Sequence, residues 1–281
     1  MRIPLGSSDF LRGIAETPAI ALKNRYFEQD PTNQEDQVAL LARPGLRKWK
    51  TLATSPVRGM YSQPGAFAES LFVVSGPKLY EIEQDETVTD LGTVTGTAAV
   101  SMAATDTTNR LFIANGAGLQ RYSVADGLDA VTVPDNDGII SVGYIAGYVI
   151  CVVAQGEGKN GRFYWIEPGE ETIDPLNFAT AERSPDPVWN VVVRGDEFWL
   201  PGPASTEVWF PSGDGLAPFI RQQARVFDKG VWEGTVVQIK DWMLAVGIDG
   251  MPYKIGSEPM PIGTPGIVQR FREAINAQRA A

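Results

Sequence analysis

The chain contains no histidine among its 281 residues. This absence excludes the serine–histidine–aspartate and cysteine–histidine arrangements that activate a nucleophile, and it removes the commonest protein ligand of transition metals. The only cysteine, Cys151, lies within a run of valine and isoleucine, so we predict a buried, unreactive thiol. The lack of a disulfide framework is consistent with assembly in a reducing cytoplasm.

Long apolar runs are also absent. No stretch approaches the roughly 20 apolar residues of a membrane-spanning helix, and the N-terminal segment lacks the charge and hydrophobicity pattern of a secretory leader. Apolar residues make up 43% of the chain, but 29 glycines and 20 prolines interrupt it too often for long helices. We therefore expect a mostly β domain with a large core, no leader and no membrane partner.

A pair of apolar segments returns about every 40 residues. Residues 71–74 (LFVV) and 79–82 (LYEI) are followed by 111–114 (LFIA) and 119–122 (LQRY) with the same spacing. Looser copies follow at 149–152 with 163–166, at 198–200 with 208–210, and at 242–245 with 253–255. A period of this length in an all-strand chain is typical of a β-propeller, whose four-stranded blades each need about 40 to 50 residues.

Two further segments complete most repeats. An apolar stretch precedes each pair and a short outer segment follows, for example 91–94, 178–180 and 219–222. Asn115-Gly116 and Asp249-Gly250 lie between paired segments, where a hairpin turn needs a positive φ. We predict an all-β fold, a β-propeller of about five four-stranded blades with an N-terminal arm and a short C-terminal helix. A β-sandwich with evenly spaced hairpins is the alternative.

The two ends of the chain differ from the repeats. We assign residues 1–56 to an N-terminal arm, 57–263 to the β-propeller and 264–281 to a helix. In the arm, residues 10–22 are moderately apolar, 30–36 resemble an exposed polar loop, and 46–52 alternate like a strand that could complete the last blade.

The C-terminal segment has the pattern of an amphipathic helix. Thr264 is placed to cap its N-terminus and Pro265 to begin it. The apolar residues Ile267, Phe271 and Ile275 then follow at steps of four, with Val268 and Ala274 flanking them, which predicts one apolar stripe. This stripe either packs under the propeller or docks on a neighbouring subunit.

Charge is distributed unevenly along the chain. The net charge is -10, yet residues 1–60 hold nine Lys or Arg against six Asp or Glu, which leaves residues 61–281 with -13. An acidic body argues against tight binding of nucleic acid, because neutralisation of phosphates by Lys and Arg supplies most of that affinity. The alternative is that the acidity only keeps the protein in solution.

Candidate catalytic residues are few. Asp106, Asp196, Glu207 and Asp249 could in principle act as an acid–base pair, as in propeller glycosidases, but charged residues near hairpin turns are usually solvated turn formers. The glycine-rich stretch 156–161 has no helix after it and is better interpreted as a hairpin loop than as a phosphate-binding loop. We predict no catalytic, cofactor-binding or metal-binding residues and no cofactor.

Several segments resemble one family in order and spacing. They are 24–28 (NRYFE), 43–46 (RPGL), 76–82 (GPKLYEI), 161–166 (GRFYWI), 174–182 (DPLNFATAE) followed by 184–186 (SPD), and 205–210 (STEVWF). Together they are similar to the packaged-DNA stabilisation proteins of short-tailed bacteriophages, also called tail hub or head-closure proteins.

This resemblance implies a structural protein of the virion without enzymatic activity. It implies a ring of copies, a hexamer in the family, that joins the portal–adaptor complex to the lower tail or tail needle and helps to retain packaged DNA, which passes through without specific binding. Members of the family often continue past such a helix, so we expect either a smaller ring or a further protein that supplies this part.

Two other functions fit the predicted fold. A carbohydrate-active propeller, either a glycoside hydrolase or a lectin, would place carboxylates and tryptophans around one cleft. A monomeric interaction platform would use the same fold to bind other proteins. A ring of several subunits would distinguish the head-closure protein from both.

Overall fold

The computed structural model describes residues 25–29, 38–106, 108–156, 158–181, 186–215, 217–239, 242–256 and 258–280. The apolar segment 10–22, the polar loop 30–36 and residues 24, 182, 184 and 185 of the resembling segments lie outside the described residues. Within these ranges, no helix is both long enough and apolar enough to span a membrane.

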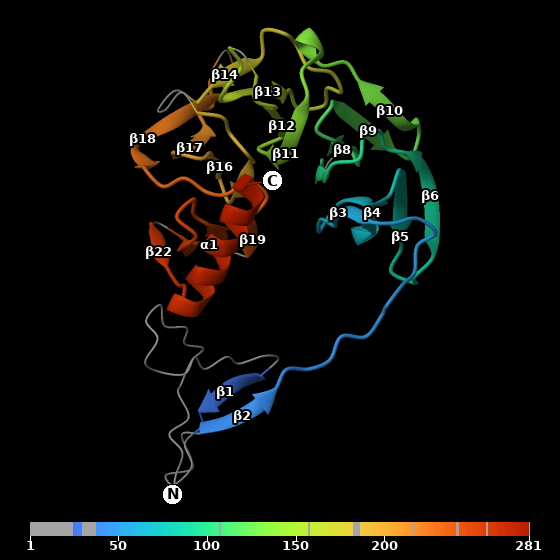
Figure 1. Ribbon diagram of the computed structural model, residues 1–281. Helices are drawn as coiled ribbons and strands as arrows, with labels where there is room; N and C mark the ends of the chain where they lie inside the picture. The colour runs from blue at the N-terminus through green and yellow to red at the C-terminus, as the bar shows by residue number, and fades with distance from the viewer. Residues whose placement is uncertain are drawn as a thin grey trace, which may run out of the picture. The chain divides into compact units, whose positions relative to one another are not determined.

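Five four-stranded antiparallel sheets confirm the predicted β-propeller (Figure 1). Each sheet is a meander in which consecutive strands pair, as the repeat predicts. The strands of blades 1 to 3 are, in chain order, β3 (Val57–Tyr61), β4 (Leu71–Ser75), β5 (Lys78–Ile82), β6 (Val88–Thr93), β7 (Ser101–Ala104), β8 (Leu111–Ala114), β9 (Leu119–Ser123), β10 (Gly127–Val131), β11 (Ile139–Ile145), β12 (Tyr148–Val153), β13 (Arg162–Ile166) and β14 (Phe178–Thr180).

Blades 4 and 5 follow the same order. Their strands are β15 (Val192–Arg194), β16 (Glu197–Pro201), β17 (Thr206–Pro211), β18 (Phe219–Phe227), β19 (Val237–Ile239), β20 (Trp242–Val246), β21 (Pro252–Ile255) and β22 (Pro259–Pro261). Short 3-10 turns, η1 (Phe67–Glu69) and η2 (Pro134–Asn136), lie between strands. The chain divides into two compact units, Leu52–Met243 and a second formed by Met1–Thr51 with Leu244–Ala281.

The core lies between the blades, and strand β8 shows why. All four of its side chains are fully buried, so the strand is covered on both faces. Leu111 and Ile113 pack in a cluster with side chains of blade 1, whereas Phe112 and Ala114 pack in a cluster with blade 3. Because successive side chains of a strand point to opposite faces, the continuous apolar run in the sequence fills two interfaces at once.

Strand β12 repeats this arrangement one blade further on. Val149, Cys151 and Val153 join the cluster with blade 2, and Ile150 and Val152 join the cluster with blade 4. Cys151 is fully buried, and this burial raises the pKa of its thiol. The prediction of a buried thiol is confirmed.

Polar side chains link the inner strands of neighbouring blades. Ser101 Oγ of β7 accepts a hydrogen bond from Val142 N of β11 over 3.1 Å. Ser141 Oγ of β11 in turn accepts one from Val191 N, next to β15, over 3.1 Å.

The expected ring-closing strand over residues 46–52 is wrong. This segment carries no strand, and Leu46 and Trp49 are 91% and 52% exposed, so nothing buries its alternating pattern. The fourth strand of blade 5 is β22, which pairs with β21. The arm instead contains a hairpin, in which β1 (Arg25–Gln29) pairs antiparallel with β2 (Val38–Ala42).

The C-terminal helix is confirmed as α1 (Pro265–Ala280), but its predicted stripe is not buried as one face. Val268 and Ile275 are buried, whereas Ile267 and Phe271 are 38% and 37% exposed. The hydroxyl of Thr264 precedes the helix but is buried without a hydrogen-bond partner, so it does not cap the helix as predicted. The helix therefore packs on its own blade through Val268 and Ile275, and two of the three residues of the predicted stripe stay partly exposed.

Candidate functional site

The four carboxylates considered for catalysis lie in three blades and have different surroundings. Asp106, in the connection from β7 to β8, is exposed and accepts a hydrogen bond from the hydroxyl of Tyr144. Asp196 is exposed in the β15–β16 turn. Both connections join the first and second strands of a blade.

Asp249 occupies a different kind of connection. It lies in the turn between β20 and β21, the second and third strands of blade 5, and therefore at the opposite end of its blade's strands. Its Oδ1 accepts a hydrogen bond from Met251 N and its Oδ2 accepts one from the hydroxyl of Tyr253, both over 2.9 Å. These contacts fix the turn, which is the structural role predicted for a charged turn residue.

Glu207 is the one buried member of the set, with 2% of its surface exposed. Its Oε2 accepts a hydrogen bond from Trp209 Nε1 over 2.9 Å, and its Oε1 lies 3.3 Å from Nη1 of Arg221. A carboxylate whose two oxygens are both held by donors of its own blade anchors that blade.

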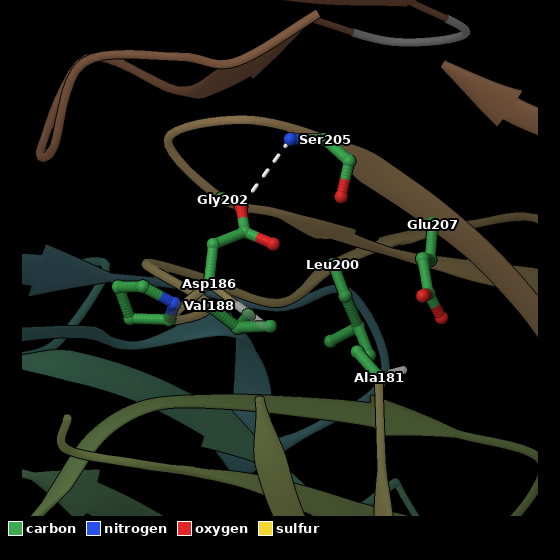
Figure 2. Close-up of a pocket in the computed structure, with 8 residues that line it drawn as sticks. Ala181, Asp186, Val188, Leu200, Gly202, Ser205 and Glu207 are labelled. Atoms are coloured by element: carbon green, nitrogen blue, oxygen red, sulfur yellow. Dashed lines mark hydrogen bonds between the residues drawn. The ribbon is translucent and has the colours of Figure 1, made fainter. Parts of the chain in front are cut away.

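Glu207 also lines a small pocket of about 180 Å³ in blade 4 (Figure 2). Asp186 lies on the same pocket, and its Oδ2 accepts hydrogen bonds from the backbone nitrogens of Ala204 and Ser205 over 2.9 and 3.3 Å. Asp186 therefore holds the turn between β16 and β17. Sequence reasoning did not single it out for this role, because the bonds come from backbone groups 18 and 19 residues away.

The glycine-rich stretch 156–161 joins β12 to β13, so its interpretation as a hairpin loop is confirmed. Lys159 in this loop is ion-paired with the buried Asp137, and the hydrogen bond from Lys159 to Asp137 raises the pKa of the lysine. The hydroxyl of Tyr164 donates to the other oxygen of Asp137 over 3.1 Å. The ion pair therefore joins this loop to the segment just before β11.

The described residues contain no group of three or more carboxylate or cysteine side chains that could hold a metal ion. What the described surface offers instead is exposed apolar side chains at defined places. Leu176 is 82% exposed and Phe178 is 43% exposed at the outer edge of blade 3. In the second unit, Ile262, Ile267 and Phe271 are exposed on α1 and the segment before it. Exposed apolar side chains mark a surface that binds other proteins where they gather into one patch, whereas single ones are normal on a protein surface.

A family model described as "Bacteriophage P22 Gp10, beta-propeller" and named Phage_stabilise matches residues 15–250. The chain belongs to this family. It is therefore a phage protein of the stabilisation family with a β-propeller fold, and the resemblance seen in the sequence is confirmed at that level. Residues 251–281, with β21, β22 and α1, lie outside the match. No curated protein matches the chain.

Solved structures with a similar fold have other functions. A streptogramin B lyase is 12% identical with a TM-score of 0.54, and the match covers 77% of this chain and 71% of the lyase. A virginiamycin B lyase from Staphylococcus aureus is 12% identical with a TM-score of 0.53, covering 74% and 70%. The Pan2 WD40 domain of Neurospora crassa is 10% identical with a TM-score of 0.52, covering 81% and 73%. At this identity the likeness shows the fold alone.

Proposed function

We propose that this chain is a tail hub or head-closure protein of a bacteriophage virion. Copies of it form a ring that joins the portal–adaptor complex to the lower tail or tail needle and helps to retain the packaged DNA. The observation that carries the proposal is the match of a phage stabilisation family over residues 15–250 of a five-bladed propeller. The protein assembles in the host cytoplasm and acts by shape and attachment, without catalysis.

The charge of the propeller supports this role. Residues 52–243 contain 25 Asp or Glu against 12 Lys or Arg, a net charge of -13. A surface of this sign repels DNA phosphates and supplies no counterion release, so a duplex moves past it without being adsorbed. A ring of such propellers confines DNA without binding it.

The hydrogen bonds that Ser101 and Ser141 make link the inner strands of blades 2, 3 and 4. In the proposed ring, the channel for DNA is enclosed by several copies of the chain and not by a single propeller.

Catalysis is the less favoured function. Asp106, Glu207 and Asp249 are each engaged by nearby donors, as described above. A histidine-to-alanine variant of the S. aureus virginiamycin B lyase is catalytically inactive. This chain contains no histidine, so that chemistry has no equivalent residue here.

The test combines the purified chain with the isolated portal–adaptor complex of its phage. Negative-stain images are expected to show a ring of the chain capping the adaptor, and the isolated chain is expected not to retain duplex DNA at low salt. If the chain does not bind the adaptor and instead binds or cleaves glycans, the proposal is wrong and the carbohydrate-active function takes its place. Removal of residues 1–22 is expected to weaken adaptor binding. Unchanged binding would show that residues 1–22 do not contribute to the contact with the adaptor.

A further inference from the structure

The two compact units of the chain carry opposite net charges. Residues 52–243 carry -13, whereas residues 1–51 and 244–281 together hold 12 Lys or Arg against nine Asp or Glu, a net charge of +3. Two copies that meet through their acidic units repel each other. Two copies that meet with the basic unit of one against the acidic unit of the next attract each other, and such a head-to-tail contact closes into a ring when its rotation permits.

The basic unit offers an exposed apolar surface next to arginine. Ile267 and Phe271 are one helical turn apart on α1, and Ile262 lies just before the helix, with 38%, 37% and 48% of their surfaces exposed. We refer to these three residues as the helix flank. Arg270 lies between Ile267 and Phe271 in the sequence, and α1 holds three arginines against one glutamate.

The helix that carries this flank is firmly attached to its own blade. Arg272 Nε donates a hydrogen bond to the carbonyl oxygen of Asp249 over 2.8 Å, and a Cβ on Gly250 would lie 2.5 Å from Cγ of Arg272. Val268 and Ile275 of the helix are buried. The flank is therefore presented by a fixed element, so a partner does not need to order it first.

The acidic unit offers a surface that complements the helix flank. Leu176 is the most exposed large apolar side chain described in residues 52–243, and Phe178 lies two residues further on. We refer to these two as the Leu176 knob. Three exposed carboxylates accompany the knob in this part of blade 3: Glu167, Glu170 and Asp174.

Hydrogen bonds hold the Leu176 knob in place. Leu176 N donates to Oδ1 of Asp174 over 2.9 Å, and Asn177 N donates to the carbonyl oxygen of Asp174 over 2.9 Å. Asn177 is also bonded to blade 3, since its carbonyl oxygen accepts a hydrogen bond from Trp165 N and its Nδ2 donates to Glu167. Leu176, which is 82% exposed on this well-bonded turn, contributes little to the packing of its own chain.

We propose that the helix flank of one copy docks on the Leu176 knob of the next copy, and that this contact forms the ring. Leu176 packs against Ile267 and Phe271, and the net positive charge of α1 faces the carboxylates around the knob. Buried apolar anchors surrounded by complementary charge are the usual pattern of a specific interface. This inference rests on the proposed function, because it identifies the joint of the proposed ring.

The experiment uses full chains and measures mass by light scattering at low salt. One variant carries Ile267→Glu with Phe271→Glu, a second carries Leu176→Glu, and Val124→Glu is the control, since Val124 is 77% exposed in the β9–β10 turn of blade 2. Wild type and control are expected to assemble beyond one chain. Each of the other two variants is expected to lose assembly and to have the mass of one chain while keeping the wild-type circular dichroism.

Mixing the two defective variants gives the decisive result. The Leu176 variant still has an intact helix flank and the helix variant still has an intact knob, so the mixture is expected to form pairs of chains and nothing larger. Higher salt is expected to weaken these pairs. Folded variants that assemble like wild type, or a mixture that stays monomeric, would overturn the inference.

The wild type is measured both alone and on the isolated adaptor. A wild type that stays monomeric in both measurements also overturns the inference. If that monomer still binds the adaptor, the proposed head-closure function stands and only the joint is wrong. If it does not bind the adaptor, the proposed function fails as well.

Discussion

Arg58 Nε donates a hydrogen bond over 2.7 Å to the carbonyl oxygen of Ala98, in the connection from blade 1 to blade 2. The same guanidinium also donates to the carbonyl oxygens of Gly76, Val94 and Thr95 over 3.0 to 3.3 Å. Only 9% of Arg58 is exposed, and this burial lowers its pKa, although arginine stays charged at neutral pH. One side chain thus joins the strand β3, the β4–β5 turn and the connection between two blades.

Replacement of this residue, Arg58→Met, is expected to destabilise the protein by about 2–4 kcal/mol, because it removes four hydrogen bonds from a charged donor, one of them to the buried carbonyl group of Val94. Urea denaturation followed by circular dichroism measures the change. The control in the same blade is Lys78→Met, which breaks the largely exposed pair of Lys78 with Asp90 at 3.1 Å. That change is expected to cost less than about 1 kcal/mol. Equal effects of the two substitutions would contradict the role of Arg58.

The repeat in the sequence predicted the blades well because the second strand of most blades is buried on both faces. Runs such as that of β8 must be apolar throughout, so they stand out from the turns between them. The outer strands are partly exposed to solvent, so their sequences differ less from those of the turns. The prediction placed an outer segment of blade 1 at 91–94, whereas β6 covers Val88–Thr93 with mostly exposed side chains.

The last strand could not be predicted from the same pattern. β22 contains Pro259 and Pro261, and proline is disfavoured within sheets because it has no N–H to donate. As the edge strand of blade 5, β22 pairs only with β21, so one of its sides needs no ladder hydrogen bonds. The alternating pattern of residues 46–52 is more typical of a strand than the sequence of β22, but this segment forms no strand.

The helix was predicted correctly as an element but not in its contacts. Steps of four from Ile267 define an apolar line, but a helix of 3.6 residues per turn shifts such a line around its surface. With Arg272 held against Asp249 and Gly250, only Ile275 of the predicted stripe is buried, together with its neighbour Val268. Which flank stays exposed depends on this tertiary contact, which the sequence pattern does not contain.

Gly230 approaches the backbone of the β16–β17 turn closely. A Cβ at this position would lie 1.6 Å from the carbonyl oxygen of Pro203 and 2.2 Å from its carbonyl carbon. Gly230→Ala is therefore expected to destabilise the protein by about 3 kcal/mol or more, since the obstacle is backbone that cannot rotate away. Gly156→Ala, where no atom lies within 4 Å, is the control and is expected to change stability by less than about 1 kcal/mol. Thermal denaturation of both variants measures the difference.

Glu197 and Arg225 form a bidentate pair beside Trp199 in blade 4. Burial alone would raise the pKa of Glu197, but the hydrogen bonds from Arg225 and from Trp199 outweigh it and lower the pKa. A lowered carboxyl pKa stabilises the fold above the unfolded value of about 4.3, and this stabilisation is lost as the pH falls through the folded pKa. The pair therefore contributes at neutral pH and little in acid.

Arg225→Gln is expected to cost about 1–2 kcal/mol at pH 7 and progressively less below about pH 4. Denaturation curves of wild type and variant across this pH range measure the effect. Arg225→Lys keeps the positive charge but not the planar fork, so its loss at pH 7 is expected to be smaller. A stability difference between wild type and Arg225→Gln that is the same at pH 3 and pH 7 would show that Arg225 acts by packing on Trp199 instead.

Cys151 is expected to be chemically silent in the folded protein. Its thiol is fully buried in the cluster between blades 2 and 3, and its raised pKa leaves almost no thiolate at neutral pH. A disulfide reagent is therefore expected to label it only as fast as the propeller unfolds. Cys151→Ala is expected to cost about 1 kcal/mol for the lost packing, and Cys151→Ser more, because a hydroxyl in this apolar cluster loses its hydration. Rapid labelling under native conditions would show that blades 2 and 3 separate without global unfolding.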